Sequence, residues 1–256
     1  MIKVKSANRS IEIMELLTRE PFGLTLSEIS QALDLPVSST YEILRSLVDC
    51  RMLSLIHKRY SVGLRLFEIS QAISRDFFLL QCARPYVLET RDRLKSTIHL
   101  AALDQTDVVY LSKVNFSLAR TSPSRVGVRL PAHLTALGKV MLSKLSDQNI
   151  YELYKNYDFK IVTKNSTSSI QMLITKLNKI RHDQYAFDAG EYIEDLYCVA
   201  VPVVSEYSDL KMALSCSSNN STSQEFNLET ILDELNSEAS NIAKSITFFY
   251  ERYCSK

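Results

Sequence analysis

The chain has 256 residues, 46% of them hydrophobic, so it can bury the core of one large domain or of two smaller ones. Its 30 Lys and Arg residues nearly balance 29 Asp and Glu residues. The formal net charge of +1 therefore predicts no global attraction to nucleic acid, acidic substrates or anionic membranes, and any basic surface must be local.

Glycine is scarce, with five residues where an average usage of about 7% would give about 18. Phosphate-binding loops of the GxGxxG and GxxxxGK[ST] types need closely spaced glycines, because the backbone must approach the phosphate. The five glycines fit neither pattern. The sequence thus argues against nucleotide-dependent chemistry, and we expect no cofactor.

The five cysteines are widely spaced without a CxxC, and the four histidines show no HExxH and no ligand spacing with cysteine. We therefore expect neither a disulfide framework nor a metal site. No stretch is apolar for long enough to form a signal peptide or a membrane-spanning helix. These absences predict a cytoplasmic protein without membrane contact.

Two short helices are predicted at the N-terminus. The first follows Ser10, carries apolar residues on one face and stops before Pro21. The second begins near Leu26, because Thr25 and Glu28 form a T-x-x-E capping box.

A third helix is predicted to open at Pro36, with Ile43 and Leu44 on its apolar face. After it, the short apolar runs 52–56 and 60–64 are separated by His57, Lys58 and Arg59, which is typical of a hairpin with a basic tip. Three helices and a hairpin in about 60 residues are the order of a winged helix-turn-helix.

In a winged helix-turn-helix the third helix enters the major groove and the hairpin tip meets the phosphate backbone. The alternative is that the serines merely begin a helix and that the basic turn is solvated. The first 63 residues carry only 8 Lys and Arg residues against 7 Asp and Glu residues, a weak electrostatic footprint. The candidate DNA contacts are Thr25, Ser38, Ser39, Thr40, Tyr41, Arg45, Lys58 and Arg59.

The rest of the chain predicts a linker helix over 64–80 and an α/β domain over 81–256, so the expected fold class is α+β. The apolar cluster from Phe77 to Leu80 is either buried or forms a dimer contact. Further helices are expected over 82–96, 134–145, 147–154, 169–182 and 227–253, with strands over 98–103, 108–114, 196–204 and 210–218.

Several segments together resemble the IclR family of bacterial transcription regulators, from about residue 4 to about residue 250. They read SANRSIEIMELL, LTLSEIS, LPVSSTYEILRSL, YSVGLRLFEIS and RVGVRLPAHLTALGKVMLSKLSD. The resemblance implies a winged helix domain that binds operator DNA over residues 1–63, a linker helix, and a GAF-like domain. That domain is expected to bind a small organic effector and to assemble into a homodimer or homotetramer.

The chain departs from the family pattern at the third helix and at three turns. Val37 and Glu42 replace a lysine and an arginine of the family, and Arg45 partly restores the charge. Glu42 either accepts a hydrogen bond from a cytosine or faces away from DNA. At family glycine positions this chain has Arg51, Gln184 and Asp195, and the first two are expected to be strained if those turns need positive φ.

The resemblance places an effector pocket on one face of the sheet, closed by the helix that begins at residues 135–137. Backbone N–H groups there suit a carboxylate, and two serines at a spacing of two project from one face of a strand. Asp188, with Glu191, either binds the ligand or holds its loop by capping. The candidate effector contacts are Ala136, Leu137, Asp188, Cys198, Ser215 and Ser217.

These expectations favour a regulator whose operator affinity changes when a small organic acid binds. One alternative is an enzyme with Cys198 or Cys216 as nucleophile and His133 or His182 as base, although no nucleophile signature surrounds either cysteine. We therefore expect no catalytic residues. The other alternative, motivated by Val37 and Glu42, is a sensor that has lost specific DNA binding.

Overall fold

The computed structural model describes residues 4–70, 74–116, 124–205, 210–218 and 227–253, with the side chains of residues 74–79 and 253 outside this description. The chain divides into two compact units, residues 1–77 and 78–256, and each is described by itself. Of the apolar cluster that begins at Phe77, only Leu80 has a described side chain, and it packs against the core of the second unit.

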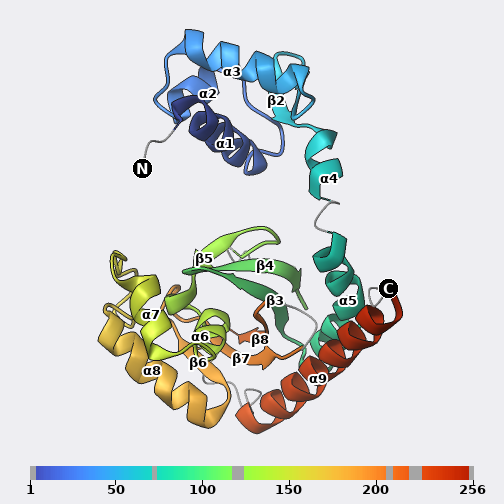
Figure 1. Cartoon of the computed structure of the whole chain (residues 1–256), viewed down its shortest axis with the longest axis vertical. Helices are drawn as coiled ribbons and strands as arrows, with labels where there is room; N and C mark the ends of the chain where they lie inside the picture. The colour runs from blue at the N-terminus through green and yellow to red at the C-terminus, as the bar shows by residue number, and fades with distance from the viewer. Residues whose placement is uncertain (1–3, 71–73, 117–123, 206–209, 219–226, 254–256) are drawn as a thin grey trace. The chain divides into compact units, whose positions relative to one another are not determined.

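The first unit is a winged helix-turn-helix, as the sequence predicted (Figure 1). Its core is formed by side chains from all three helices and both strands, including Ile13, Ile29 and Leu44. The two strands pair antiparallel. Its elements are α1 (Lys5–Thr18), α2 (Leu26–Ala32), α3 (Val37–Asp49), β1 (Leu53–Ile56) and β2 (Arg59–Val62), followed by α4 (Leu64–Ser70).

The capping box at the start of α2 is confirmed. The Thr25 amide donates to Glu28 Oε2 at 2.7 Å, and the Glu28 amide donates to Thr25 Oγ1 at 3.3 Å. The start of α1 differs from the expectation, because the helix begins at Lys5 and includes Ser10.

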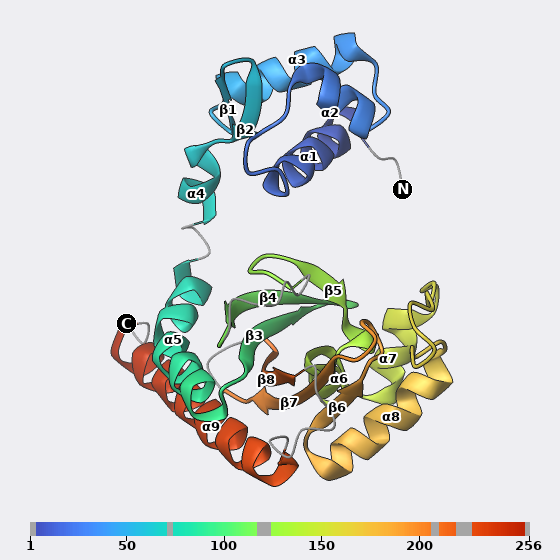
Figure 2. The same cartoon turned by 180° about the vertical axis from the view of Figure 1, so that it is seen from behind.

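The second unit is built on one six-stranded antiparallel sheet in the order β5-β4-β3-β8-β7-β6. Two long helices cover one face of the sheet, and the shorter helices cover the other (Figures 1 and 2). The strands are β3 (Thr97–Asp104), β4 (Asp107–Val114), β5 (Arg129–Pro131), β6 (Ala186–Ala189), β7 (Tyr197–Val203) and β8 (Met212–Ser218).

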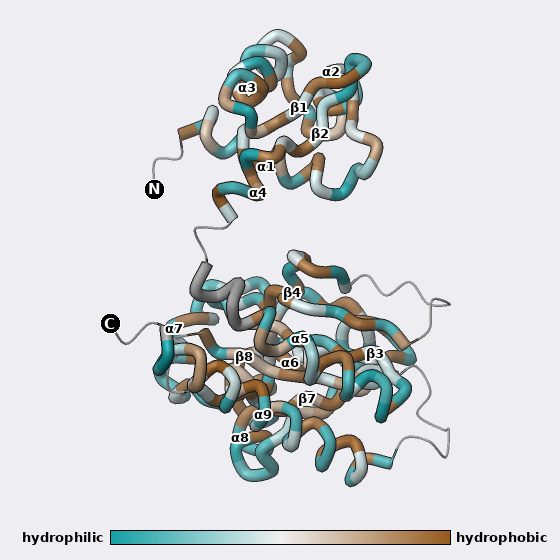
Figure 3. The backbone as a smooth tube through the Cα atoms, turned by 90° about the vertical axis from the view of Figure 1, so that its right-hand side faces the viewer, coloured by the Kyte–Doolittle hydropathy of each residue, from teal (hydrophilic) through white to brown (hydrophobic). Residues whose placement is uncertain are grey.

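Separate apolar cores lie on the two faces of this sheet. Hydrophobic and hydrophilic residues alternate along the covering helices, as expected for helices that bury one side (Figure 3). The helices of one face are α5 (Ser74–Leu94) and α9 (Leu228–Tyr253); those of the other are η2 (Ala132–Leu134), α6 (Ala136–Leu142), α7 (Asp147–Tyr154) and α8 (Ile170–Asp183).

Two elements of the second unit differ from the expectation. Strand β6 (Ala186–Ala189) was not predicted, because it is an edge strand of four residues that pairs only with β7. Helix α5 runs without a break across residue 80, where the linker helix was expected to end, and it contains Pro85 in its interior. The proline is tolerated there although it removes one helical hydrogen bond.

The three residues at family glycine positions all adopt left-handed backbone conformations, with φ of 61° at Arg51, 62° at Gln184 and 60° at Asp195. These turns therefore use the left-handed conformation that glycine adopts most readily, although the residues are not glycines. Gly138 is required for a different reason, since a Cβ there would lie 2.1 Å from the carbonyl oxygen of Ala132. The absence of a Cβ at Gly138 therefore lets α6 pack closely against η2.

We predict that Arg51→Gly stabilises the first unit. A left-handed residue with a side chain costs about 1–2 kcal/mol, and the larger unfolded-state entropy of glycine offsets part of that. The free energy of unfolding should rise by about 0.5–1 kcal/mol in urea titrations followed by circular dichroism. Arg51→Ala keeps the Cβ and serves as the control. An equal gain from both variants would contradict an origin in backbone strain.

Candidate functional site

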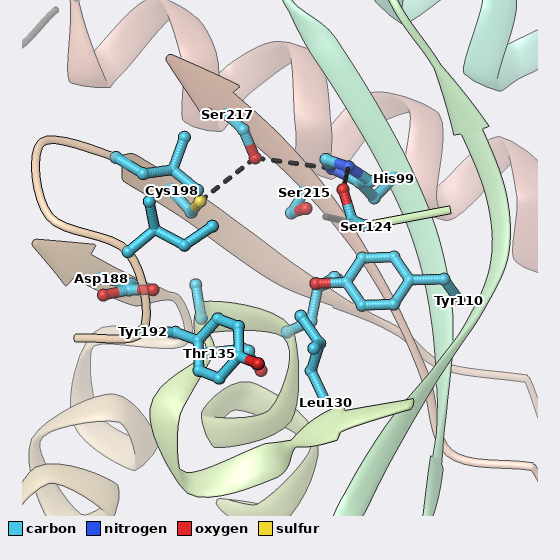
Figure 4. Close-up of a pocket in the computed structure, with 14 residues that line it drawn as sticks. His99, Tyr110, Ser124, Leu130, Thr135, Asp188, Tyr192, Cys198, Ser215 and Ser217 are labelled. Carbon is cyan, nitrogen blue, oxygen red and sulfur yellow. Dashed lines mark hydrogen bonds between the residues drawn. The ribbon is translucent and has the colours of Figure 1, made fainter. Parts of the chain in front are cut away.

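A pocket lies in the second unit between the sheet, the start of α6 and the loop after β6 (Figure 4). The space among its lining residues, counted together with its open mouth, is about 460 Å³. All six candidate effector contacts line it, and whether they touch a ligand stays a prediction. The lining residues are His99, Tyr110, Ser124, Leu130, Thr135, Ala136, Leu137, Asp188, Tyr192, Ile193, Leu196, Cys198, Ser215 and Ser217.

The sequence did not single out several of these lining residues. His99 lies on β3 directly opposite Ser215 of β8, a neighbour that only the strand register reveals. Tyr192, Ile193 and Leu196 come from the loop between β6 and β7, which carries no periodic pattern. The sequence offered one signal for His99. Side chains alternate along a strand, so His99 was expected to lie on the same face of β3 as Ala101.

Four polar side chains form a chain of hydrogen bonds along one wall of the pocket. Cys198 Sγ lies 3.1 Å from Ser217 Oγ, and Ser217 Oγ lies 3.4 Å from His99 Nδ1. His99 Nε2 lies 3.0 Å from Ser124 Oγ. Burial, with a smaller contribution from Lys113, lowers the pKa of His99 to about 3. The imidazole is therefore neutral at pH 7, with one ring nitrogen to donate and one to accept.

The protonation states of Cys198 and Cys216 argue against the enzyme alternative. Burial raises the pKa of Cys198 to about 12 and that of Cys216 to about 11, so both are thiols at neutral pH rather than nucleophilic thiolates. Neither of the two histidines considered as bases lines the pocket. His133 packs among aromatic rings, and the ring of His182 lies beside Asp183.

Asp188 lies at the pocket wall and also caps the loop that follows it. Its Oδ1 accepts a hydrogen bond from the Glu191 amide at 2.9 Å, so the two interpretations of this residue are compatible. Burial raises the pKa of Asp188 to about 6, although Lys139 acts in the opposite direction. Its carboxyl group therefore titrates much closer to neutrality than an ordinary aspartate.

Glu191 ties this loop to the rest of the unit. Its carboxylate pairs with Lys139 and with Lys176, the latter at 2.9 Å, and accepts a hydrogen bond from Thr167 at 2.6 Å. Its carbonyl oxygen accepts a hydrogen bond from Ser166 at 2.9 Å. Although burial opposes ionisation, Lys139 and these hydrogen bonds lower the pKa of Glu191. It is therefore an anion that holds the loop in place.

In the first unit, the exposed face of α3 includes Ser38, Arg45 and Tyr41, with Tyr41 45% exposed. Lys58 is exposed at the hairpin tip, in a left-handed conformation with φ of 64°. Ser39 is half-buried and donates to the Pro36 carbonyl at 3.1 Å. An exposed helix face beside a cationic tip is the surface that a winged helix presents to DNA.

Three of the candidate DNA contacts also have structural roles. Thr40 is completely buried and its hydroxyl donates to the Pro36 carbonyl at 3.0 Å, so it has no surface to offer to DNA. Thr25 is the cap of α2. Arg59 belongs to β2, where it donates to the carbonyl of Gly23 at 3.0 Å and pairs with Glu28 at 3.3 Å. These bonds fix the hairpin to the turn before α2.

Within the described residues, no helix is both long and apolar enough to cross a membrane. The described part of the chain likewise contains no group of three or more His, Cys, Asp or Glu side chains that could hold a metal ion.

Comparison with known proteins defines the class of this chain. The family model described as "Bacterial transcriptional regulator IclR C-terminal" matches residues 72–244, and the model described as "IclR helix-turn-helix domain" matches residues 6–55. The fold and the pocket are thus those of a DNA-binding transcription regulator with a C-terminal ligand-binding domain. The chain belongs to the IclR family of bacterial transcriptional regulators.

Similar proteins cover nearly the whole chain. The HTH-type transcriptional regulator XynR of Escherichia coli is 27% identical over 96% of this chain and 98% of its own length. The regulator KdgR of Dickeya chrysanthemi is 29% identical, covering 96% of this chain and 81% of its own.

Solved structures show the same fold. The Thermotoga maritima IclR structure has a TM-score of 0.74 with 25% identity, covering 95% of this chain and 99% of its own. An IclR homologue from Microbacterium hydrocarbonoxydans, complexed with 4-hydroxybenzoate, has a TM-score of 0.80 with 23% identity, covering 94% of this chain and 99% of its own.

We predict that Asp188→Asn stabilises the second unit at neutral pH. Because the folded-state pKa lies above the ordinary value of 3.8, the folded protein binds more protons than the unfolded chain, and its stability falls as pH rises from about 4 to about 6. The variant lacks this fall, so its advantage should reach about 2–3 kcal/mol at pH 7.5 and vanish near pH 4. Urea unfolding at several pH values measures it.

The control for this prediction is Asp158→Asn, which removes an exposed carboxylate that does not line the pocket. It should leave the pH dependence of unfolding unchanged. A constant difference between Asp188→Asn and the unmodified protein from pH 4 to 7.5 would show that the carboxyl group of Asp188 titrates normally.

Proposed function

We propose that this protein binds operator DNA through α3 and the hairpin tip, and that a small organic acid bound in the pocket changes its affinity for the operator. The observation that carries the proposal is the presence, in one chain of this family, of a winged helix with an exposed α3 face and of a pocket lined by hydroxyl groups. Its site of action is then the bacterial cytoplasm, where operator DNA lies.

The DNA-contacting set that we propose is Ser38, Ser39, Tyr41, Arg45 and Lys58. Ser38 and Tyr41 lie early on α3, where side chains of a recognition helix reach base edges. Arg45 follows one turn later and supplies a cation for phosphate or guanine. Thr25 and Arg59 contribute indirectly, by fixing the elements that carry these side chains.

The effector we propose is compact and carries a carboxylate together with further polar groups. Ser215 and Ser217 project from one face of β8 toward the pocket (Figure 4), and Ala136 and Leu137, which also line it, form the first turn of α6. Hydroxyl and amide donors converging from two sides suit an anion. The complex of a homologue of the same fold with 4-hydroxybenzoate is consistent with a small organic ligand.

We also propose that the protein acts as a homodimer or homotetramer. The short helix α4 exposes apolar side chains, with Leu64 82% and Phe67 62% exposed. A second copy of the chain would bury these groups. It would also supply a second winged helix-turn-helix, so that the pair could bind the two half-sites of a two-fold symmetric operator. The effector then changes DNA affinity only as far as it binds the competing arrangements of the oligomer unequally.

A second candidate function rests on one observation about α3. Val37 is 54% exposed and Glu42 is exposed on the helix that would face DNA, where an apolar and an acidic side chain add no phosphate contact. A sensor without specific DNA recognition, acting through protein contacts, would show the same surface. A measurement of DNA binding distinguishes the two functions.

The test is gel-shift binding of the full chain to the DNA upstream of its own gene, with and without a panel of small organic acids. We expect sequence-preferring binding whose affinity falls steeply with salt, and at least one acid that shifts it. No binding at low salt supports the sensor function. If acids bind in the pocket but none of them changes the affinity for DNA, the effector part of the proposal is contradicted.

We predict that Arg45→Ala weakens operator binding by about 5- to 20-fold and lowers the slope of log affinity against log salt concentration by about 1. The reason is the loss of one cation on the exposed face of α3. Lys164→Ala, which removes an exposed cation of the second unit, serves as the control. Equal losses from both variants would show that Arg45 contributes only to net charge.

A further inference from the structure

The charges around the pocket are unusual for a site that receives an acid. The described residues that line it include no lysine or arginine, and the one carboxyl group among them is that of Asp188. The imidazole of His99 is neutral at pH 7, as shown above. A carboxylate that enters this space therefore meets hydroxyl groups and another carboxylate, but no lining cation.

Two cations lie behind Asp188 and are already paired, while Lys113 of β4 lies opposite His99 and donates to the Ser124 carbonyl at 2.6 Å. Lys139 from α6 and Lys176 from α8 both contact the carboxylate of Glu191. Among the described contacts, Asp188 forms no ion pair with either lysine, and its raised pKa indicates that its own charge is poorly compensated. A further anion would leave one buried negative charge without a partner, which is strongly unfavourable in a desolvated site.

The remaining titratable groups around Asp188 cannot compensate for that charge. Tyr192 comes from the loop, Tyr110 from β4 and Cys198 from β7. Burial raises the pKa of Tyr110 and that of Cys198, so both are neutral from pH 5 to pH 8. His133, whose charge interacts with that of Glu191, has its pKa lowered by burial to about 4 and is also neutral.

We propose that the acid enters the pocket together with one proton, which Asp188 takes up, so that the ligand is held by a carboxylic acid–carboxylate hydrogen bond. This inference rests on the proposed function of the pocket as a site for a small acid. Solvent supplies the proton, Asp188 becomes the donor, and the ligand carboxylate accepts; no covalent bond changes. The site then holds as many negative charges as before, with the ligand carboxylate replacing that of Asp188.

Two properties follow from this arrangement. Two carboxyl groups that share one proton form a short, charge-assisted hydrogen bond, which favours acids over neutral compounds of the same shape. Since free Asp188 has a pKa of about 6, the apparent dissociation constant of a monocarboxylate should rise with pH above that value, by up to tenfold per pH unit. A neutral isostere takes up no proton and should show no such slope.

The experiment is isothermal titration calorimetry of the full chain with 4-hydroxybenzoate and with its neutral isostere 4-hydroxybenzamide. Acetate serves as a smaller carboxylate probe. Titrations at pH 7.5 in phosphate and in Tris, whose ionisation enthalpies differ, give the number of protons taken up. We expect about one proton per bound carboxylate and none per bound amide. Repeating the titrations from pH 5.5 to pH 8 gives the slope.

The variant that tests the assignment is Asp188→Asn, which keeps the side-chain shape but cannot ionise. It should bind the carboxylates with no proton uptake and with a dissociation constant that no longer rises from pH 6 to pH 8. Asp158→Asn, which removes an exposed carboxylate outside the pocket lining, should behave as the unmodified protein does.

The possible failures are distinguishable. Carboxylate binding that is equally tight at pH 5.5 and pH 8, without proton uptake, overturns the inference and leaves the effector pocket intact. Proton uptake that persists in Asp188→Asn also overturns it, since another group must then titrate. No saturable binding of either carboxylate by either protein at any pH overturns the acid class, and with it the effector part of the proposed function.

Discussion

The buried carboxylate of Glu191 is the interaction on which the second unit's pocket depends. It joins Lys139 of α6 and Lys176 of α8, while its amide binds Asp188 and its carbonyl binds Ser166. Two helices, a strand end and a loop therefore meet at one side chain. Removing a partner from such a cluster leaves a buried charge uncompensated, which costs several kcal/mol. The loop that carries Tyr192 over the pocket is held by this cluster and not by apolar packing alone.

Much of this arrangement was predictable because it follows local rules. The capping box at Thr25 and Glu28, the helical faces of α7 and α8, and the hairpin of β3 and β4 each depend on residues close in the sequence. The resemblance to a family then added what local rules do not contain, namely which strand residues share a pocket. The neighbours Ser215 and Ser217 could be placed on one face by their spacing alone.

What the sequence could not supply depends on contacts between distant segments. His99 reaches Ser217 only because β3 pairs with β8 in one particular register, and it reaches Ser124 from a distant segment that precedes β5. The burial of Thr40 and the bonds of Arg59 likewise depend on the whole winged helix, so the sequence alone could not show that Thr40 is buried or that Arg59 also holds the hairpin in place. The sequence showed that Arg51 and Gln184 stand where the resemblance expects glycine. Only the structure shows that both adopt the left-handed backbone conformation that glycine favours.

The strands of the sheet connect the pocket to α5, the helix that follows α4 in the chain. Side chains alternate along β3, β7 and β8, so His99, Cys198 and Ser215 face the pocket while Ile98, Val199 and Leu214 face the opposite core. That core contains residues of α5, the helix that begins only a few residues after α4 ends. A ligand that displaces these strands must therefore disturb the packing of α5, because close-packed cores do not deform continuously. Acid binding can be coupled to DNA binding through α5 only if conformations that differ in the packing of α5 also differ in their affinity for the acid, which is the thermodynamic requirement for allostery.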